Sequence, residues 1–328
     1  METHSPVSGV HPVMPQRDTV SPAVPPAVRH SVELVSVFAA GPGGGNPAPI
    51  VADAAGMSDT EMQAVAQRYG HESGFVLPAP PGSECDYEFR FWVPNHEMPM
   101  CGHATVGAVW LLHQSGRLQR DLLTIHTHSG KVRARITGHT AEGATVEISQ
   151  PAGRIETLSE AQLSRDEIID VLGISAAQLA PLPIQNACTS RVKTLIPLTS
   201  TADLDSLQPR FEKIEALCER IGSTGLYPYA TFDAAQQIFD ARQFPRASGY
   251  PEDAATGIAA SALSFGLLTN GIVEASERTI TIRQGRAMKR PSQISVRFSF
   301  DAGLDPSRPD GCWLGGPVSF EGHAGASS

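Results

Sequence analysis

Two pairs of segments place titratable side chains beside glycine turns that lead into apolar helices. Glu72 precedes Cys101-Gly102-His103 in the first half of the chain, and Asp253 precedes Thr256-Gly257-Ile258 in the second. A helix that begins at such a turn exposes backbone N–H groups with no partner inside the helix, and their partial positive charge attracts anions. Two such starts that face each other would bind a carboxylate between them. They would also stabilise the enolate-like charge that forms when a neighbouring proton is removed.

Three ionisable side chains are candidates for moving that proton: Glu72, His103 and Asp253. A carboxylate in a dry cleft has its pKa raised by desolvation, which suits reversible proton transfer. This chemistry requires neither a metal nor an organic cofactor, and we expect none. Each candidate also has a structural interpretation, because Glu72 could be a solvated turn residue, His103 a helix-start histidine and Asp253 a helix cap.

The elements that must position these residues alternate between strands and helices in both halves. Ser58 and Glu61 form a capping box, which predicts a helix that ends at Gly70. The glycine cluster 41–45 lacks the Lys-Ser/Thr ending of a phosphate loop and is predicted to be a turn. We expect strands at 32–38, 75–77, 87–93, 122–127, 131–137, 144–149, 192–198, 237–244, 279–283 and 293–300, and further helices at 103–113, 165–172, 210–221 and 257–268.

The two halves carry a similar pattern. Arg90-Phe91 leads through prolines and an acidic residue to the Cys101 turn and a helix that ends at Leu111-Leu112. In the second half, 242–244 leads in the same way to the Thr256 turn and a helix that ends at Leu267-Leu268. We interpret this as a duplication that placed one strand, one glycine turn and one buried helix in each domain. Chance similarity between two helices rich in Ala and Gly is the alternative.

Composition narrows the class of protein. The 328 residues favour two domains, and 41% hydrophobic with 18% charged residues is typical of a soluble globular protein. A net charge of −9 argues against nucleic acid as a partner. No segment is long and apolar enough to cross a membrane. The five cysteines form no CxxC pair, which indicates reduced thiols and a cytoplasmic location.

Metal binding is not expected from the spacing of the ligand-type residues. Eleven histidines are present, but there is no HExxH motif and no paired Cys/His spacing. For the domains we expect a flexible Pro-rich extension at 1–30, an N-terminal domain at 31–150, a C-terminal domain at 151–322 and a tail at 323–328.

Seven motifs in order along the chain resemble the phenazine-biosynthesis PhzF-like family. They are Gly44-Gly45-Asn46-Pro47, Glu72-Ser-Gly-Phe75, Cys101-Gly102-His103-Ala-Thr105, Pro183-Ile-Gln185 with Leu195–Leu198, Glu252–Gly257, Gln284-Gly285 with Arg290-Pro-Ser292, and Gly315-Gly316. The resemblance implies an α+β fold of two pseudo-symmetric diaminopimelate-epimerase-like domains, each a barrel-like sheet around a central helix. It also implies that the final strand, about 312–321, returns to the first domain.

The resemblance further implies a function. The best understood members isomerise trans-2,3-dihydro-3-hydroxyanthranilate, with a glutamate that moves a proton between carbons. Carried over by motif, Glu72 would be the acid/base, and His103 and Asp253 would orient and polarise a small carboxylated substrate. The amides of Gly102, His103, Gly257 and Ile258 would hold its carboxylate. Asn46 and Thr256 are further candidates for substrate binding, although Asn46 also suits a turn, and a homodimer is possible.

Two positions depart from the phenazine enzymes of this family. Ile258 stands where they have a serine, and Cys101 where they have a small residue other than cysteine. Loss of the hydroxyl argues against the dihydrohydroxyanthranilate substrate. Cys101 also occupies the place of a catalytic thiol in related epimerases, and a helix start lowers a thiol pKa. A one-thiol epimerase or racemase is therefore an alternative, as are a merely structural Cys101 and a non-enzymatic interaction protein on the same fold.

Overall fold

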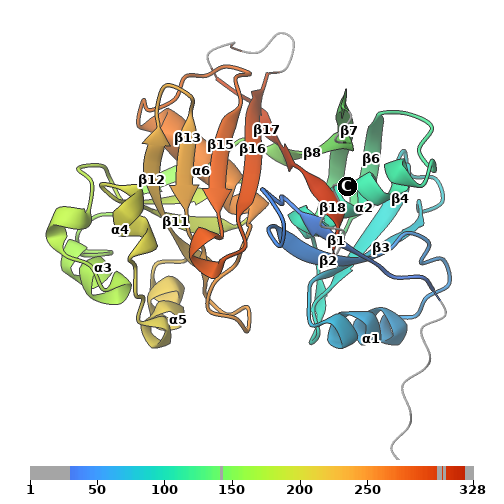
Figure 1. Ribbon diagram of the computed structural model, residues 1–328, viewed down its shortest axis with the longest axis horizontal. Helices are drawn as coiled ribbons and strands as arrows, with labels where there is room; N and C mark the ends of the chain where they lie inside the picture. Colours follow the sequence, from blue (N-terminus) through green and yellow to red (C-terminus); the bar gives the residue numbers. More distant parts are fainter. Residues whose placement is uncertain (1–29, 141–142, 301–304, 306–307, 322–328) are drawn as a thin grey trace, which may run out of the picture.

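The protein has two lobes that lie side by side, each built of strands around one buried helix (Figure 1). The computed structural model describes residues 30–140, 143–300, 305 and 308–321. The expected extension at 1–30, apart from His30, and the expected tail at 323–328 lie outside the described residues. The mixture of a large sheet with helices confirms the predicted α+β fold class.

Strands and helices alternate through both lobes. The first half contains β1 (Glu33–Val37), β2 (Asn46–Val51), α1 (Asp59–Tyr69), β3 (Ser73–Pro78), β4 (Tyr87–Trp92), β5 (Glu97–Met98), α2 (Gly102–Gln114), β6 (Leu122–Thr127), β7 (Gly130–Thr140) and β8 (Gly143–Pro151). The second half contains β9 (Arg154–Thr157), α3 (Arg165–Leu172), β10 (Gln185–Cys188), β11 (Val192–Pro197), α4 (Thr201–Asp205), α5 (Phe211–Arg220), β12 (Gly225–Asp233), β13 (Ile238–Ala241), β14 (Phe244–Pro245), α6 (Gly257–Thr269), β15 (Ile280–Gln284), β16 (Ser292–Ser299), β17 (Gly311–Gly316) and β18 (Val318–Phe320).

The order of strand pairing in the first half repeats in the second, which confirms the predicted pseudo-symmetry. β1–β2 is antiparallel, β2–β3 parallel, β3–β4 antiparallel, β4–β6 parallel, and β6–β7 and β7–β8 antiparallel. The same sequence of directions runs through β10–β11, β11–β12, β12–β13, β13–β15, β15–β16 and β16–β17. The helix that each lobe surrounds follows the corresponding strand, α2 after β4 and β5, α6 after β13 and β14.

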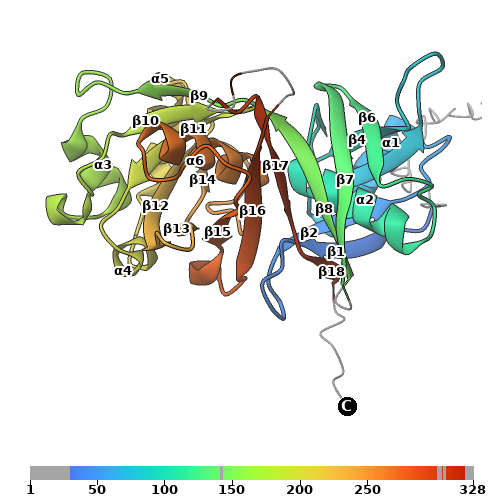
Figure 2. The same cartoon turned by 90° about the horizontal axis from the view of Figure 1, so that it is seen from above.

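Strand β17 joins the two lobes. It pairs with β16 on one side and with β8 on the other, so hydrogen bonds connect all the strands into one network (Figure 2). After β17 the chain enters β18, which pairs with β1. The domain boundaries stay a prediction, but this crossing fixes how the two lobes face each other.

Helices α2 and α6 are the centres of the two lobes. Each has thirteen residues, ten of which are buried, and each consists almost wholly of small and apolar side chains. Such a helix buries its whole circumference rather than one face. α2 packs against β1, β2, β3, β8 and β18, and α6 against β9, β10, β11, β16 and β17. None of the helices described is both long and apolar enough to span a bilayer.

Some elements differ from the sequence expectations. The strand expected at 237–244 is split into β13 and β14: the Arg242 N–H still donates to Pro228 of β12, but Gln243 pairs with Asp253 in an isolated bridge before β14 begins. Strands β9, β10 and β12 were not anticipated: β12 contains Pro228, and β10 begins with the polar pair Gln185-Asn186. All five cysteines have free thiols, as expected.

A Cβ atom added at the start of α6 would force the buried Leu314 side chain to move, whereas one added at the start of α2 meets only ordinary contacts. A Cβ atom on Gly257 would lie 2.7 Å from Leu314 Cδ1, but one on Gly102 would lie 3.9 Å from Ile148 Cδ1 and Ile258 Cγ2. We therefore expect Gly257→Ala to lower the free energy of unfolding by about 1–3 kcal/mol and Gly102→Ala to change it by less than about 0.5 kcal/mol. Urea unfolding of both variants measures this, and equal effects would contradict the packing argument.

Candidate active site

The starts of the two central helices meet between the lobes. Cys101 is the N-cap residue of α2 and Thr256 is that of α6, and both have extended backbone (φ −135° and −126°). Neither side chain accepts a hydrogen bond from the first N–H groups of its helix. α2 and α6 are in contact, and Ile258 Cγ2 lies 3.9 Å from where a Cβ on Gly102 would be. The first N–H groups of both helices therefore lack a side-chain cap in the same small region, which favours an anion there.

One pocket of about 180 Å³ lies at this junction. Most of the residues that the sequence singled out line it: Glu72, Cys101, Gly102, His103, Asp253, Thr256, Gly257 and Ile258. Asn46 is the exception. It lies beside the pocket wall, where its amide donates to Asp253 Oδ1 at 2.9 Å and to the carbonyl of Ala255 at 3.1 Å. The structure thus brings together residues from four separate motifs.

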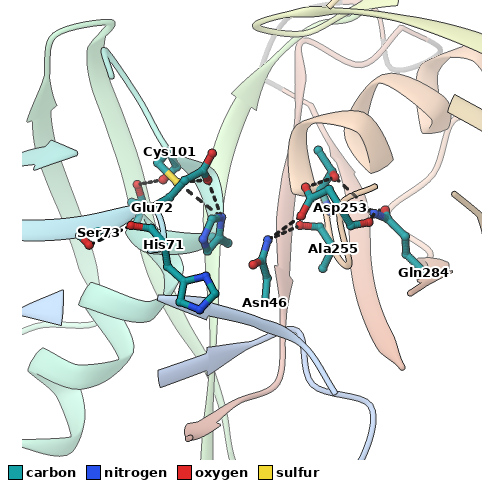
Figure 3. A network of polar contacts seen from close by, with 11 residues as sticks. Asn46, His71, Glu72, Ser73, Cys101, Asp253, Ala255 and Gln284 are labelled. Atoms are coloured by element: carbon teal, nitrogen blue, oxygen red, sulfur yellow. Dashed lines mark hydrogen bonds and ion pairs between the residues drawn. The ribbon is translucent and has the colours of Figure 1, made fainter. Parts of the chain in front are cut away.

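Glu72 and Cys101 lie together on the first-lobe side of the pocket (Figure 3), and His103 completes a cluster with them. The Cys101 thiol donates to Glu72 Oε2 at 3.3 Å, and His103 Nδ1 lies 3.4 Å from both Glu72 Oε2 and Cys101 Sγ. Glu72 reaches this position because α1 ends at Gly70 in the left-handed conformation, after which β3 begins at Ser73. His103 Nε2 is buried and has no hydrogen-bond partner among the described residues.

The environment of Cys101 corrects one sequence expectation. The helix start was expected to lower the pKa of this thiol, but burial and then the nearby Glu72 charge raise it well above its usual range. The side chain is 4% exposed, so desolvation of the thiolate outweighs the helix dipole. Cys101 is therefore a protonated donor at neutral pH rather than a ready nucleophile.

Asp253 is the centre of a second cluster, on the other side of the pocket (Figure 3). Its carboxylate accepts hydrogen bonds from Asn46 and from the hydroxyl of Thr256. Gln284 donates to the Asp253 carbonyl at 2.7 Å and accepts from Tyr227 at 3.0 Å. Burial, and then the charge of Glu72, raise the pKa of the Asp253 carboxyl to about 6.

A matching Arg–Glu pair holds the loop before each helix start. Arg90 donates to both oxygens of Glu97, at 2.6 and 2.7 Å, and Arg242 donates to both oxygens of Glu252, at 2.8 and 2.7 Å. Each glutamate stands four residues before its helix cap. Bidentate pairs of this kind fix orientation as well as position. The two lobes therefore share the support of the site as well as the central helix.

The first cluster has a donor set that could hold a cation. One atom each of Glu72, Cys101 and His103 lie within 4.8 Å of one another. Carboxylate, thiolate and imidazole are all zinc ligands. Sequence spacing did not reveal this set because Glu72 is far from the other two residues along the chain. The expectation that the protein binds no metal stays a prediction.

Comparison with known proteins decides the family. A family model described as phenazine biosynthesis-like protein, PhzC-PhzF, matches residues 35–308. The chain belongs to this family. The uncharacterized isomerase YddE of Escherichia coli K12 is 30% identical over 301 residues, covering 90% of this chain and 98% of that protein. The trans-2,3-dihydro-3-hydroxyanthranilate isomerase of Pseudomonas chlororaphis is 28% identical over 270 residues, covering 82% of this chain and 90% of that enzyme.

Solved structures agree with the PhzC-PhzF assignment. The crystal structure of a Bacillus anthracis phenazine biosynthesis protein of the PhzF family matches with a TM-score of 0.77 at 26% identity. The match covers 88% of this chain and 96% of that one. The family recognised from the sequence is thus confirmed, and the protein is a member of a family of isomerases.

The pocket of this PhzC-PhzF protein also contains residues that the sequence argument missed. Arg191, Lys193, Gln243 and Tyr250 line it from the second lobe. The only sequence signal for Lys193 is a charged residue within the otherwise apolar run of β11, VKTLIP. Gln243 and Tyr250 belong to the irregular stretch around β14, where no periodicity points to a pocket.

The raised pKa of Asp253 predicts how the stability of the folded protein depends on pH. In the folded protein the pKa of this carboxyl is about 6, compared with 3.8 for an ordinary aspartate in an unfolded chain. Its ionisation therefore costs stability progressively as pH rises from about 4 to about 6. In Asp253→Asn this cost is absent, so the melting temperature of the variant relative to wild type should rise by a few degrees between pH 4 and pH 7.

Thermal melts across this pH range measure the effect. Asp121→Asn, which removes an exposed carboxyl, is the matched control and should show no such rise. A difference between Asp253→Asn and wild type that is constant with pH would contradict the buried-carboxyl assignment.

Proposed function

We propose that this protein is a cofactor-independent isomerase that shifts a proton, and with it a double bond, within a small carboxylated metabolite. The observation that carries the proposal is the shared pocket of Glu72 and the two facing helix starts. The N–H groups at Gly102 and Gly257 would bind the substrate carboxylate, and Glu72 would move the proton. This is general acid/base catalysis with electrostatic stabilisation of the intermediate charge.

The proposed step begins with ionised Glu72. Its carboxylate takes a proton from a carbon conjugated with the substrate carboxylate, and the negative charge spreads onto the carboxylate oxygens near the helix starts. Protonated Glu72 then returns the proton to another carbon of the same conjugated system. No atom is gained or lost overall, so no co-substrate is needed. The Cys101 thiol and His103 Nδ1 both lie within 3.4 Å of Glu72 Oε2, which supports a role for them in holding Glu72 in position.

On the opposite side, Asp253 with Asn46 and Thr256 would orient the substrate. The Asp253 carboxylate is held by two donors, so its free lone pairs face a defined direction. A substrate hydroxyl or amino group could donate to it. The pocket volume of about 180 Å³ restricts the substrate to a small metabolite.

The isomerase of Pseudomonas chlororaphis acts on trans-2,3-dihydro-3-hydroxyanthranilate, and we propose a different substrate for this protein. Ile258 lines the pocket with an apolar side chain beside the start of α2. A polar substrate group at this place would leave water without gaining a hydrogen bond from the protein, and this would weaken its binding strongly. The substrate is therefore proposed to have an apolar edge next to Ile258.

The contacts favour this isomerase over a one-thiol epimerase. Inversion of a carbon centre by two groups requires them to lie on opposite faces of that carbon. Cys101 and Glu72 are hydrogen-bonded to each other, so both lie on one side of the pocket. The raised pKa of Cys101 also disfavours its action as a base.

The first test concerns Glu72. Glu72→Gln keeps the shape of the side chain but removes the base, so we expect exchange of substrate hydrogen with deuterated solvent to slow by at least about a hundredfold. Proton NMR in deuterium oxide measures this with a carboxylated metabolite selected by thermal shift. Glu156→Gln on β9, outside the pocket, is the control. Undiminished exchange in Glu72→Gln would sink the proposed mechanism.

The second test concerns the thiol and the possible metal. Because the Cys101 thiol is protonated and only supports Glu72, Cys101→Ala should slow exchange by less than about tenfold, the effect of losing one weak hydrogen bond. Treatment with EDTA should leave exchange unchanged. Complete loss in Cys101→Ala would favour the epimerase, and loss after EDTA that zinc restores would favour a metal at Glu72, Cys101 and His103.

A further inference from the structure

Lys193 is a buried charge without a counter-ion in the part of the chain that the structure describes. Four Asp, Glu, Lys or Arg side chains are buried there: Glu147, Lys193, Asp240 and Arg242. Three of them have close ion pairs, with Arg135 and Arg297, with Arg283, and with Glu252 respectively. Lys193 is 5% exposed and has neither an ion pair nor a hydrogen bond of its side chain to another described residue, and its ammonium is not among the fully buried unpaired atoms, so it keeps some contact with solvent. An ammonium that has lost most of its hydration without gaining a counter-ion favours the binding of an anion.

The side chain of Lys193 lies at the wall of the same pocket. β11 carries it there, and Arg191, two residues earlier, lines the pocket as well. The Asp253 and Glu72 charges act on Lys193 only from beyond ion-pair distance, and burial lowers the pKa of Lys193 to about 8. The ammonium is therefore mostly charged at neutral pH and faces a cavity that a ligand can fill.

Gln243 stands behind this wall. It is 1% exposed, and neither its amide nitrogen nor its amide oxygen has a partner among the described residues or is open to solvent. A Cβ atom at Gly225 would lie 2.3 Å from Gln243 Nε2, so the amide fits only because that position has no side chain. The amide is therefore closed off from the cavity, whereas Lys193 and Arg191 line it as cations.

We infer that Lys193, with Arg191, binds a second anionic group of the substrate, so that the pocket takes a small diacid. The inference rests on the proposed function, in which the starts of α2 and α6 hold the first carboxylate. Lys193 and Arg191 would neutralise the second. The substrate class is then a short dicarboxylic acid, with the isomerised carbons between its two acid groups.

Matched pairs of acids test the second anion site. Succinate, glutarate and L-glutamate each have a monoamide of nearly the same shape: succinamate, glutaramate and L-glutamine. Thermal-shift titrations of the wild-type protein should give diacid affinities roughly tenfold or more above those of the amides, as expected for a charged hydrogen bond. In Lys193→Met, which keeps the length of the side chain, this advantage should disappear while the response to the monoamides remains.

Lys213→Met is the control, because Lys213 on α5 pairs with Asp170 outside the pocket. It should retain the diacid advantage. The unliganded Lys193→Met protein should melt no lower than wild type, since it loses an unpaired buried charge. A clearly lower melting temperature would assign Lys193 to the fold and overturn the inference.

Failure of the second anion site and failure of the proposed function would give different results in this experiment. Equal thermal shifts of the wild-type protein with diacids and monoamides would overturn the second anion site. They would not affect the proposal that the helix starts bind the first carboxylate. A Lys193→Met protein that loses the monoamides as well would place the first carboxylate at Lys193 and overturn the inference. No response to any of the six acids would count against both proposals.

Discussion

The arrangement of this protein depends on two buried helices whose first turns meet without caps. Each helix buries ten of its thirteen residues, but both starts line the pocket, where Gly102 and Ile258 are partly exposed. The first N–H groups of a helix have no partner inside the helix, so they need a side chain, water or a ligand. Ser58 supplies such a cap for α1 through its side chain, but Cys101 and Thr256 do not for α2 and α6. The uncapped helix starts meet where the lobes meet, and this is the basis of the anion site proposed at the junction.

The two pseudo-symmetric lobes support this site in the same way but contribute different side chains to it. Arg90–Glu97 and Arg242–Glu252 are equivalent pairs that anchor the loops before the two helices. One position after each of these glutamates the residues differ, because Met98 is apolar and Asp253 is charged. The caps differ as well. The first lobe therefore contributes the Glu72 cluster, whereas the second contributes the Asp253 network with Lys193 and Arg191. This asymmetry would favour a single orientation of a bound molecule.

Much of the fold and part of the site follow from the sequence, for identifiable reasons. The bounds of α2 and α6 were predicted within one residue, because runs of small and apolar residues after a glycine turn have few other conformations. The shared pocket of Glu72, His103 and Asp253 followed from the family motifs. Lys193 and Gln243 could not be recognised, because their significance lies in partners that are missing, and only a three-dimensional arrangement shows that. The high pKa of Cys101 likewise depends on burial and on Glu72, which is distant in sequence.

The balance of charge in the pocket links the proposed proton transfer by Glu72 to the proposed binding of a diacid. Glu72 and Asp253 bring negative charge to a site that is meant to receive a carboxylate, and like charges at close range repel strongly in a dry cavity. The helix starts offset one anion, while Lys193 and Arg191 offset another. A diacid would thus complete an alternation of charge across the pocket, whereas a monoacid would leave Lys193 buried and unpaired. The same ammonium that is unfavourable in the empty protein then becomes a source of selectivity, since only a ligand with a second anion removes its cost.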